Sequence, residues 1–243
     1  MITAAISIFY YILLTVWSLV YFVFMLVLFA CTAPFDKERI VLHKASRVWA
    51  MSIFRINPLW KLRVEGKQYL RPGDRYVVTV NHQSMLDIPL MYVLPYLNFK
   101  WVAKTDVYKW PLFGIVLRLH GDITVDPKGS VRKTMHFIEA GSERLNNGTS
   151  VIIFPEGTRS RDGEIHNFKD GAFMLARHAG AGILPCVIDG GKNFIKGWRL
   201  QPTTFTVRIT PPIPATTVQD IPLRQLIADV RQRSVDELQN IRS

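Results

Sequence analysis

The chain has 243 residues, of which 49% are hydrophobic, and this length suits one sizeable core because single cores grow to about 250 residues before they split. Two cysteines are too few for a disulfide framework, which excludes the small disulfide-stabilised secreted folds. The formal net charge of +11 lies entirely beyond residue 35, because residues 1–35 contain no Asp, Glu, Lys or Arg. The basic remainder either faces an anionic partner, such as a nucleic acid, membrane headgroups or a phosphorylated substrate, or simply keeps the protein soluble.

The uncharged N-terminal segment, residues 2–31, predicts a membrane-embedded helix. As a helix it is about 45 Å long, whereas a bilayer core needs about 20 residues. A secretory signal would need a basic start and a shorter apolar run. Lys37 and Arg39 follow the segment closely, and by the positive-inside rule they place the body of the chain in the cytoplasm, at the inner (cytoplasmic) membrane. Whether the segment spans the bilayer or only dips into it stays open at this point.

Residues 47–64 (RVWAMSIFRINPLWKLRV) mix aromatic and aliphatic side chains with Arg and Lys. This composition suits a helix that lies among the headgroups of an anionic membrane surface, and a plain core helix fits the pattern equally well. We therefore expect two parts. Residues 1–62 would form the membrane segment and interfacial helix, and residues 63–243 would form one α/β domain.

Beyond residue 65 the sequence alternates between strand-like and helix-like stretches. Six short runs rich in β-branched residues predict strands at 76–80, 99–103, 122–126, 150–154, 183–188 and 203–210. Helical spacing predicts helices at 131–145, with Ser130 as the N-cap, at 171–179 and at about 223–241. Alternation of this kind predicts an α/β fold, with a mixed, mostly parallel sheet flanked by helices.

Polar side chains follow three of the predicted strands, at the point where each strand ends. Ligands of such sheets bind beyond the carboxyl ends of the strands, so we expect the three loops to converge on one site. The residues concerned are Asn81, His82, Ser84 and Asp87 after the first strand, Lys104 after the second, and Glu156, Thr158, Arg159, Ser160 and Arg161 after the fourth.

His82 and Asp87 have the spacing of a general base and the carboxylate that orients it. An Asp in the first turn of a helix can fold back onto the imidazole, fix its tautomer and leave the other ring nitrogen to accept a proton. Ser84 is not set in a G-x-S-x-G motif, so a covalent acyl-enzyme is not indicated. No second His lies at metal-ligand spacing, so no metal is predicted. Taken alone, most pairs with this spacing are structural.

A second motif accompanies the His82–Asp87 pair in the sequence. The segment NHQSMLD (81–87), together with FPEGTRSRDG (154–163), resembles the membrane glycerolipid acyltransferase family, which includes the 1-acyl-glycerol-3-phosphate acyltransferases. VAKTDVYKWPLFG (102–114) and ILPCVIDG (183–190) are similar to two further blocks of that family, in the same order. The resemblance covers roughly residues 65–200.

The resemblance implies transfer of a fatty acyl group from acyl-CoA or acyl-carrier protein to the sn-2 hydroxyl of 1-acyl-glycerol-3-phosphate, giving phosphatidic acid. His82 would deprotonate the hydroxyl while Asp87 stabilises the imidazolium. No cofactor is implied beyond the acyl donor as co-substrate.

The family's Glu-Gly-Thr-Arg block implies the substrate-binding residues. Arg159 would hold the acceptor's phosphate with help from Lys104, because a guanidinium fork matches phosphate oxygens. Glu156 is expected to orient Arg159, and Gly157 to permit a tight turn. Thr158 belongs to the same substrate-binding block.

The sequence departs from the family at one point. The family commonly has Asp-Arg in its second block, where the Arg is linked to phosphate binding, whereas this chain has Asp126, Pro127 and Lys128. Lys128, Arg132 or Arg118 would have to substitute, or the acceptor is another lysolipid. Two other classes remain. A nucleic-acid-binding module lacks a recognised motif here, and a non-catalytic, membrane-anchored lipid binder leaves the His–Asp spacing unexplained.

Overall fold

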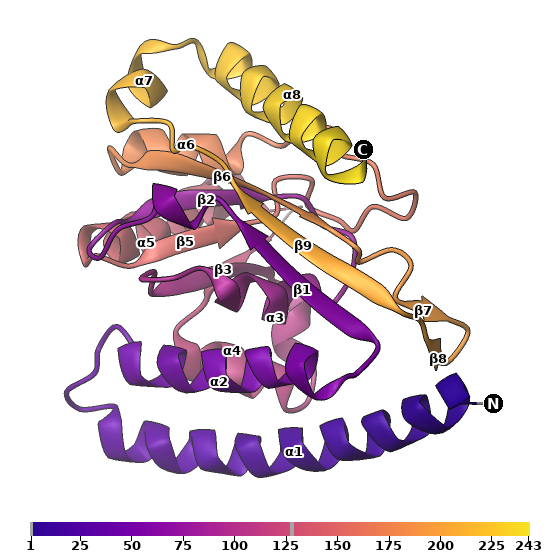
Figure 1. Cartoon of the computed structure of the whole chain (residues 1–243). Helices are drawn as coiled ribbons and strands as arrows, with labels where there is room; N and C mark the ends of the chain where they lie inside the picture. Colours follow the sequence, from indigo (N-terminus) through magenta and orange to yellow (C-terminus); the bar gives the residue numbers. More distant parts are fainter. Residues whose placement is uncertain (1, 127–128) are drawn as a thin grey trace.

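The computed structural model describes residues 2–126 and 129–243. Over these residues the chain forms a seven-stranded sheet in the order β1-β9-β6-β2-β5-β3-β4, with helices on both faces (Figure 1). The strands are β1 (Trp60–Glu65), β2 (Tyr76–Val80), β3 (Phe99–Lys104), β4 (Ile123–Val125), β5 (Ser150–Ile153), β6 (Gly182–Asp189) and β9 (Thr203–Ile209). The strands β7 (Ile195–Lys196) and β8 (Arg199–Leu200) pair separately as a short hairpin.

The sheet is mixed and mostly parallel, as predicted. In the sheet order from β6 to β4, each pair of neighbouring strands is parallel. The strand β9 runs antiparallel to β6, and β1 pairs with β9 in parallel. The carboxyl ends of β2, β5, β3 and β6 therefore meet at one edge of the sheet, and this edge carries the polar loops.

Two apolar cores sandwich the sheet because alternate side chains of each strand point to opposite faces. Val78 of β2 packs in the core under α2 (Ile40–Ile56) and α3 (Asp87–Leu90). Val77 packs in the opposite core, under α5 (Val131–Asn146), α6 (Gly171–His178), α7 (Ala215–Asp220) and α8 (Leu223–Arg242). The helix α4 (Phe113–His120) precedes the edge strand β4.

The predicted strands and helices are confirmed to within two residues at each end. Ser130 does precede α5, but its side chain makes no capping hydrogen bond. Of the two cysteines, Cys186 is buried in β6 and Cys31 is exposed.

The segment 47–64 is not one interfacial helix, contrary to the first of the two readings. The helix α2 ends at Ile56, and Trp60 begins β1. Phe54 and Trp60 are 3% and 7% exposed, because both pack with Phe205 of β9 in the core. The predicted boundary between residues 62 and 63 falls inside β1, so the two predicted parts share one sheet and one core.

The N-terminal helix α1 (Ile2–Thr32) lies along α2 at the base of the molecule (Figure 1). It is the one helix among the described residues that is long and apolar enough to cross a membrane, with a mean hydropathy of 2.6 over its most apolar window. Two of its polar side chains contact α2: Tyr10 donates to the Ile53 carbonyl at 2.9 Å, and Trp17 donates to Ser52 at 2.8 Å. Tyr11 also reaches the Trp198 carbonyl, at 2.9 Å.

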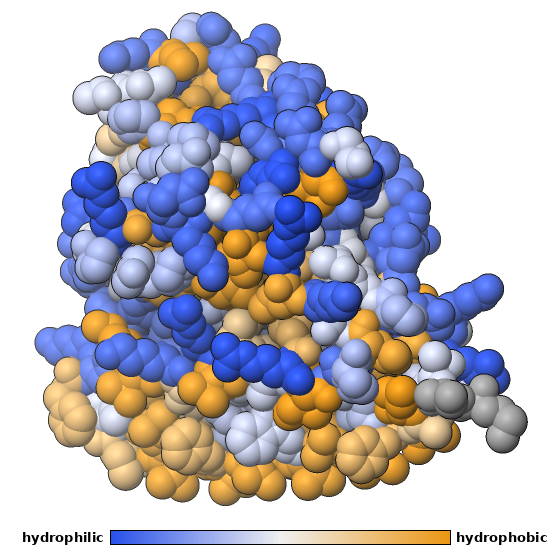
Figure 2. Space-filling model, in the orientation of Figure 1, coloured by the Kyte–Doolittle hydropathy of each residue, from blue (hydrophilic) through white to orange (hydrophobic). Residues whose placement is uncertain are grey.

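The outer face of α1 is apolar, and in Figure 2 it forms the orange base of the molecule. Large hydrophobic side chains are exposed along its length, including Phe9, Val16, Val20, Val23 and Val27. A helix that is tied to the body along one side and exposes aliphatic side chains on the other suggests membrane association.

Candidate active site

His82 and Asp87 lie at the carboxyl end of β2 and form a hydrogen-bonded pair. His82 Nδ1 lies 2.7 Å from Asp87 Oδ2. Because an ionised carboxylate only accepts, Nδ1 carries the shared proton, and Nε2 of the neutral ring is left as the acceptor. The side chain of Asp87 is 1% exposed and that of His82 is 14% exposed. The geometry is that of a general base held by a buried carboxylate.

Asp87 is fixed by backbone groups as well as by the imidazole. Its Oδ2 accepts the backbone N–H groups of Gln83 at 2.6 Å and Ser84 at 2.7 Å, and its Oδ1 accepts the Ser84 hydroxyl at 3.1 Å. These donors take up the carboxylate's remaining acceptor positions, so the charge is compensated although it is buried. Ser84 thus supports Asp87.

Two aromatic rings that the sequence argument missed position the imidazole. The Phe154 ring stacks on His82 with centroids 3.9 Å apart and an interplanar angle of 13°. Trp101 in turn stacks on Phe154, with ring centroids 5.3 Å apart and an interplanar angle of 18°. Phe154 stands directly before the Pro-Glu-Gly turn and Trp101 lies within β3, so this column links three strands. A Phe at the end of a buried strand looks like core in sequence, and only the sheet order places it against His82.

Glu156 does not orient Arg159, so this part of the sequence prediction is wrong. Its Oε1 accepts the backbone N–H of His82 at 3.0 Å, and its Oε2 accepts that of His166 at 3.0 Å. The side chain turns inward, is 5% exposed and does not line the pocket. Burial raises the pKa of the carboxyl group, and the two backbone hydrogen bonds oppose that rise. Glu156 therefore holds two loops together.

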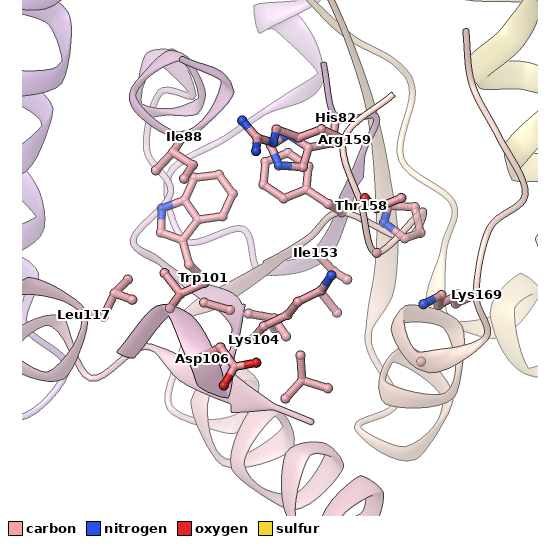
Figure 3. Close-up of a pocket in the computed structure, with 18 of the residues that line it drawn as sticks. His82, Ile88, Trp101, Lys104, Asp106, Leu117, Ile153, Thr158, Arg159 and Lys169 are labelled. Atoms are coloured by element: carbon pink, nitrogen blue, oxygen red, sulfur yellow. The ribbon is translucent and has the colours of Figure 1, made fainter. Parts of the chain in front are cut away.

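The turn after Glu156 carries the residues that face the pocket. Gly157 has a φ of 69°, in the left-handed region that a glycine adopts without strain, so the predicted tight turn is confirmed. Thr158 and Arg159 follow it with exposed side chains that line the same pocket as His82 (Figure 3). Arg159 makes no ion pair with the described part of the chain, which leaves its guanidinium available for an anion.

The pocket has a volume of about 510 Å³ and extends away from His82 between β3, α4 and α6. One end is polar, with His82, Thr158 and Arg159. Beyond them the walls are mostly apolar and aromatic, which suits an aliphatic chain. The apolar lining residues include Ile88, Trp101, Val107, Trp110, Phe113 and Leu117.

Among the described residues, three cationic side chains line this pocket. Lys104 stands at the end of β3, as predicted, and Arg159 follows β5. The third is Lys169, which the sequence argument missed; its backbone N–H donates to the Pro155 carbonyl at 2.8 Å. A Cβ atom added to Gly157 would lie 2.8 Å from Lys169 Nζ, so this ammonium group sits directly against the turn that carries Arg159.

The structure describes two of the three residues that were expected to substitute for the missing Arg of the second block. Arg118 donates to the Tyr108 carbonyl at 2.9 Å, and neither Arg118 nor Arg132 lines the pocket. Pro127 and Lys128 lie outside the described residues. Of the cations that line the pocket in the described part of the chain, Lys169 is the one that the sequence analysis did not predict.

The chain matches a known protein family. Residues 61–189 match the family model described as Acyltransferase, which is more than half of the chain. The chain therefore belongs to this acyltransferase family.

Individual relatives narrow the comparison. The chain is 32% identical over 202 residues to a 1-acyl-sn-glycerol-3-phosphate acyltransferase of Chlamydomonas reinhardtii, covering 81% of this chain and 60% of the algal protein. It is 33% identical over 183 residues to the human 1-acyl-sn-glycerol-3-phosphate acyltransferase alpha, covering 72% of this chain and 64% of the human protein. These matches thus span less than two thirds of either relative's own length.

A solved structure is similar over nearly the whole chain. The crystal structure of the 1-acyl-sn-glycerophosphate (LPA) acyltransferase PlsC from Thermotoga maritima superposes with a TM-score of 0.77 at 26% identity. The superposition covers 98% of this chain and 96% of that one, so the N-terminal helices are part of the shared fold.

Proposed function

We propose that this protein transfers a fatty acyl group from acyl-CoA or acyl-carrier protein to the sn-2 hydroxyl of 1-acyl-glycerol-3-phosphate, giving phosphatidic acid. One observation carries the proposal: the His82–Asp87 pair stands at the polar end of a mostly apolar pocket that Lys104, Arg159 and Lys169 also line. The acyltransferase relatives, which are named for this acceptor, support the same choice.

The chemistry follows from the orientation of the imidazole. The acceptor hydroxyl gives its proton to His82 Nε2 as its oxygen attacks the thioester carbonyl carbon. The imidazolium that forms is stabilised by Asp87, whose two backbone donors keep the carboxylate in place. Collapse of the tetrahedral intermediate breaks the carbon–sulfur bond, and the departing thiolate takes the proton back from Nε2. No covalent acyl-enzyme is needed.

The positions of the cations account for recognition of a phosphorylated acceptor. Arg159 offers a bidentate donor pair, and Lys104 and Lys169 offer point charges at the same pocket. Lys169 would supply a positive charge in place of the Arg that the second block lacks.

The decisive experiment offers purified protein acyl-CoA and acyl-carrier-protein thioesters with a panel of lysolipids, and the products are identified by mass spectrometry. We expect phosphatidic acid from lysophosphatidate, and slower turnover of acceptors that lack the phosphate. Preference for a phosphate-free acceptor would reassign the acceptor but keep the acyltransferase chemistry. No thiol release with any acceptor would favour the non-catalytic lipid binder instead.

We propose that α1 lies in one leaflet of the cytoplasmic membrane with the catalytic body on the cytoplasmic side. The hydrogen bonds from Tyr10, Tyr11 and Trp17 to the body support an in-plane placement, because a perpendicular helix would have to break them. Lys44 and Arg55, both exposed on α2, would then face anionic headgroups.

Deletion of residues 1–35 is expected to leave residual, salt-sensitive binding to anionic vesicles. Removal of α1 uncovers Trp49, which now stacks on Tyr21 with centroids 5.7 Å apart, beside the basic side chains of α2. The deletion also removes the Tyr10 ring that packs on Trp60, with centroids 5.2 Å apart, whereas Phe54 keeps its contact with Phe205 of β9. Vesicle sedimentation at low and high salt measures the effect.

The control for this deletion is the same truncated chain with Lys44→Glu and Arg55→Glu, which should lose the residual binding. A truncated protein that stays entirely in the supernatant with anionic vesicles at low salt would refute a membrane role for α2.

A further inference from the structure

Two arginines of α8 donate hydrogen bonds to the loop that follows the Glu-Gly-Thr-Arg turn. Arg231 donates to the carbonyls of Ile165 and His166, each at 3.0 Å. Arg242 donates to the Gly163 carbonyl at 2.7 Å and to Glu164 Oε1 at 2.8 Å. The two arginines are about three helical turns apart, so they project from one face of α8.

The same loop holds the backbone of His82 from both sides. At one end of the loop, the Ser160 N–H donates to the His82 carbonyl at 2.7 Å. At the other end, His166 shares the Glu156 carboxylate with the His82 N–H. Ile165 is buried between these ends and packs with Val187 and Leu238 of α8. The helix therefore supports the segment that carries the base, although it contributes no side chain to the pocket.

Arg242 has a closer connection to the base through Gln83. Arg242 Nη2 and Gln83 Nε2 donate to the same two acceptors: the Gly163 carbonyl, at 2.7 and 3.4 Å, and Asp189 Oδ1, at 3.1 Å each. The Gln83 Oε1 accepts the Gly191 N–H at 3.0 Å. Gln83 is the neighbour of His82, and its own backbone N–H donates to Asp87 at 2.6 Å.

We propose that Arg242 is a positioning residue of the acyl-transfer site. It acts through the Gly163 carbonyl and Asp189 on Gln83, and thereby fixes the backbone between His82 and Asp87. The guanidinium orients both acceptors and compensates the Asp189 charge, which is 23% exposed. Without the Arg242 guanidinium, the Gly163 carbonyl and the Asp189 carboxylate lose a cationic donor and hold the Gln83 side chain less firmly. The His82 imidazole then loses its alignment with the acceptor hydroxyl.

The test compares Arg242→Ala with Arg224→Ala, a matched variant on the same helix whose side chain is exposed and has no partner in the described part of the chain. Arg242→Ala should lower kcat by about 10- to 100-fold, as expected when a catalytic group is misplaced, with the KM values of both substrates changed by less than about threefold. Arg242→Lys, which keeps the charge without the fork, should recover part of kcat. In a Gln83→Ala background the effect of Arg242→Ala should nearly vanish, because both act on one network.

Hydrogen exchange supplies a readout that does not need activity, since the inference otherwise rests on the proposed function. Amides in residues 81–87 should exchange faster in Arg242→Ala and unchanged in Arg224→Ala. An inactive wild type would overturn the proposed function alone, and exchange would still decide the role of Arg242. Unchanged exchange, or a kcat equal to that of Arg224→Ala, overturns the inference. If Arg242→Ala does not fold, wild-type kcat in Arg242→Lys overturns it.

Discussion

Replacement of His82 by alanine should lower kcat by about 100-fold or more, because proton removal from the acceptor hydroxyl is part of the chemical step. The KM values should change little, since His82 is one of many residues that line the pocket. The melting temperature should stay close to that of the wild type, because the imidazole belongs to neither apolar core. Initial rates of thiol release from the acyl donor, together with thermal melting, measure both effects.

The matched control is His178→Ala, which removes an exposed imidazole at the end of α6, outside the pocket. Asp87→Asn should follow His82→Ala in direction, because it removes the charge that stabilises the imidazolium. Near-normal turnover in His82→Ala would rule out the general-base mechanism, whatever the acceptor.

Replacement of Arg159 by alanine should raise the KM for lysophosphatidate by about 10- to 100-fold, as expected for loss of a charge-assisted bidentate contact. The KM for the acyl donor and the value of kcat should change far less, because the interaction is made equally in the ground state and the transition state. Steady-state kinetics with each substrate varied in turn separate these quantities. The KM of Arg159→Lys for lysophosphatidate should lie between those of the wild type and Arg159→Ala, because lysine keeps the charge but cannot make the bidentate contact.

Arg161→Ala is the control on the same loop, because Arg161 is exposed and does not line the pocket. Lys169→Ala should also raise the KM for lysophosphatidate, and Lys128→Ala tests the substitute expected from the sequence. With an acceptor that lacks phosphate, these increases should disappear. Unchanged lysophosphatidate kinetics in both Arg159→Ala and Lys169→Ala would mean that the phosphate binds elsewhere.

The sequence predicted the contact between His82 and Asp87 because its signal is local. His82 and Asp87 belong to one strand–turn–helix unit, so five residues of spacing predict their contact. Lys104 and Arg159 come from separate strands, but the rule that parallel strands share a carboxyl edge brought them to the same pocket.

What the sequence did not reveal depends on contacts across the sheet order. Glu156 was expected to bind substrate because the residues that follow it line the pocket. Its carboxylate instead points inward and accepts two backbone N–H groups from other segments. Phe154 reaches His82 only because β5 pairs with β2. The segment 47–64 was split between a helix and an edge strand by its pairing with β9, which apolar periodicity does not encode.

The placement of α1 decides the units in which acceptor affinity should be expressed. An enzyme whose exposed aliphatic face keeps it at a bilayer meets its lysolipid by lateral diffusion, so the relevant concentration is the mole fraction of acceptor in the surface. Dilution of the acceptor with inert phospholipid, at constant bulk concentration, should then slow the reaction. If the product is phosphatidic acid, each turnover replaces one phosphomonoester lipid of the surface by another, so the negative charge that the basic side chains of α2 would face stays constant as turnover proceeds.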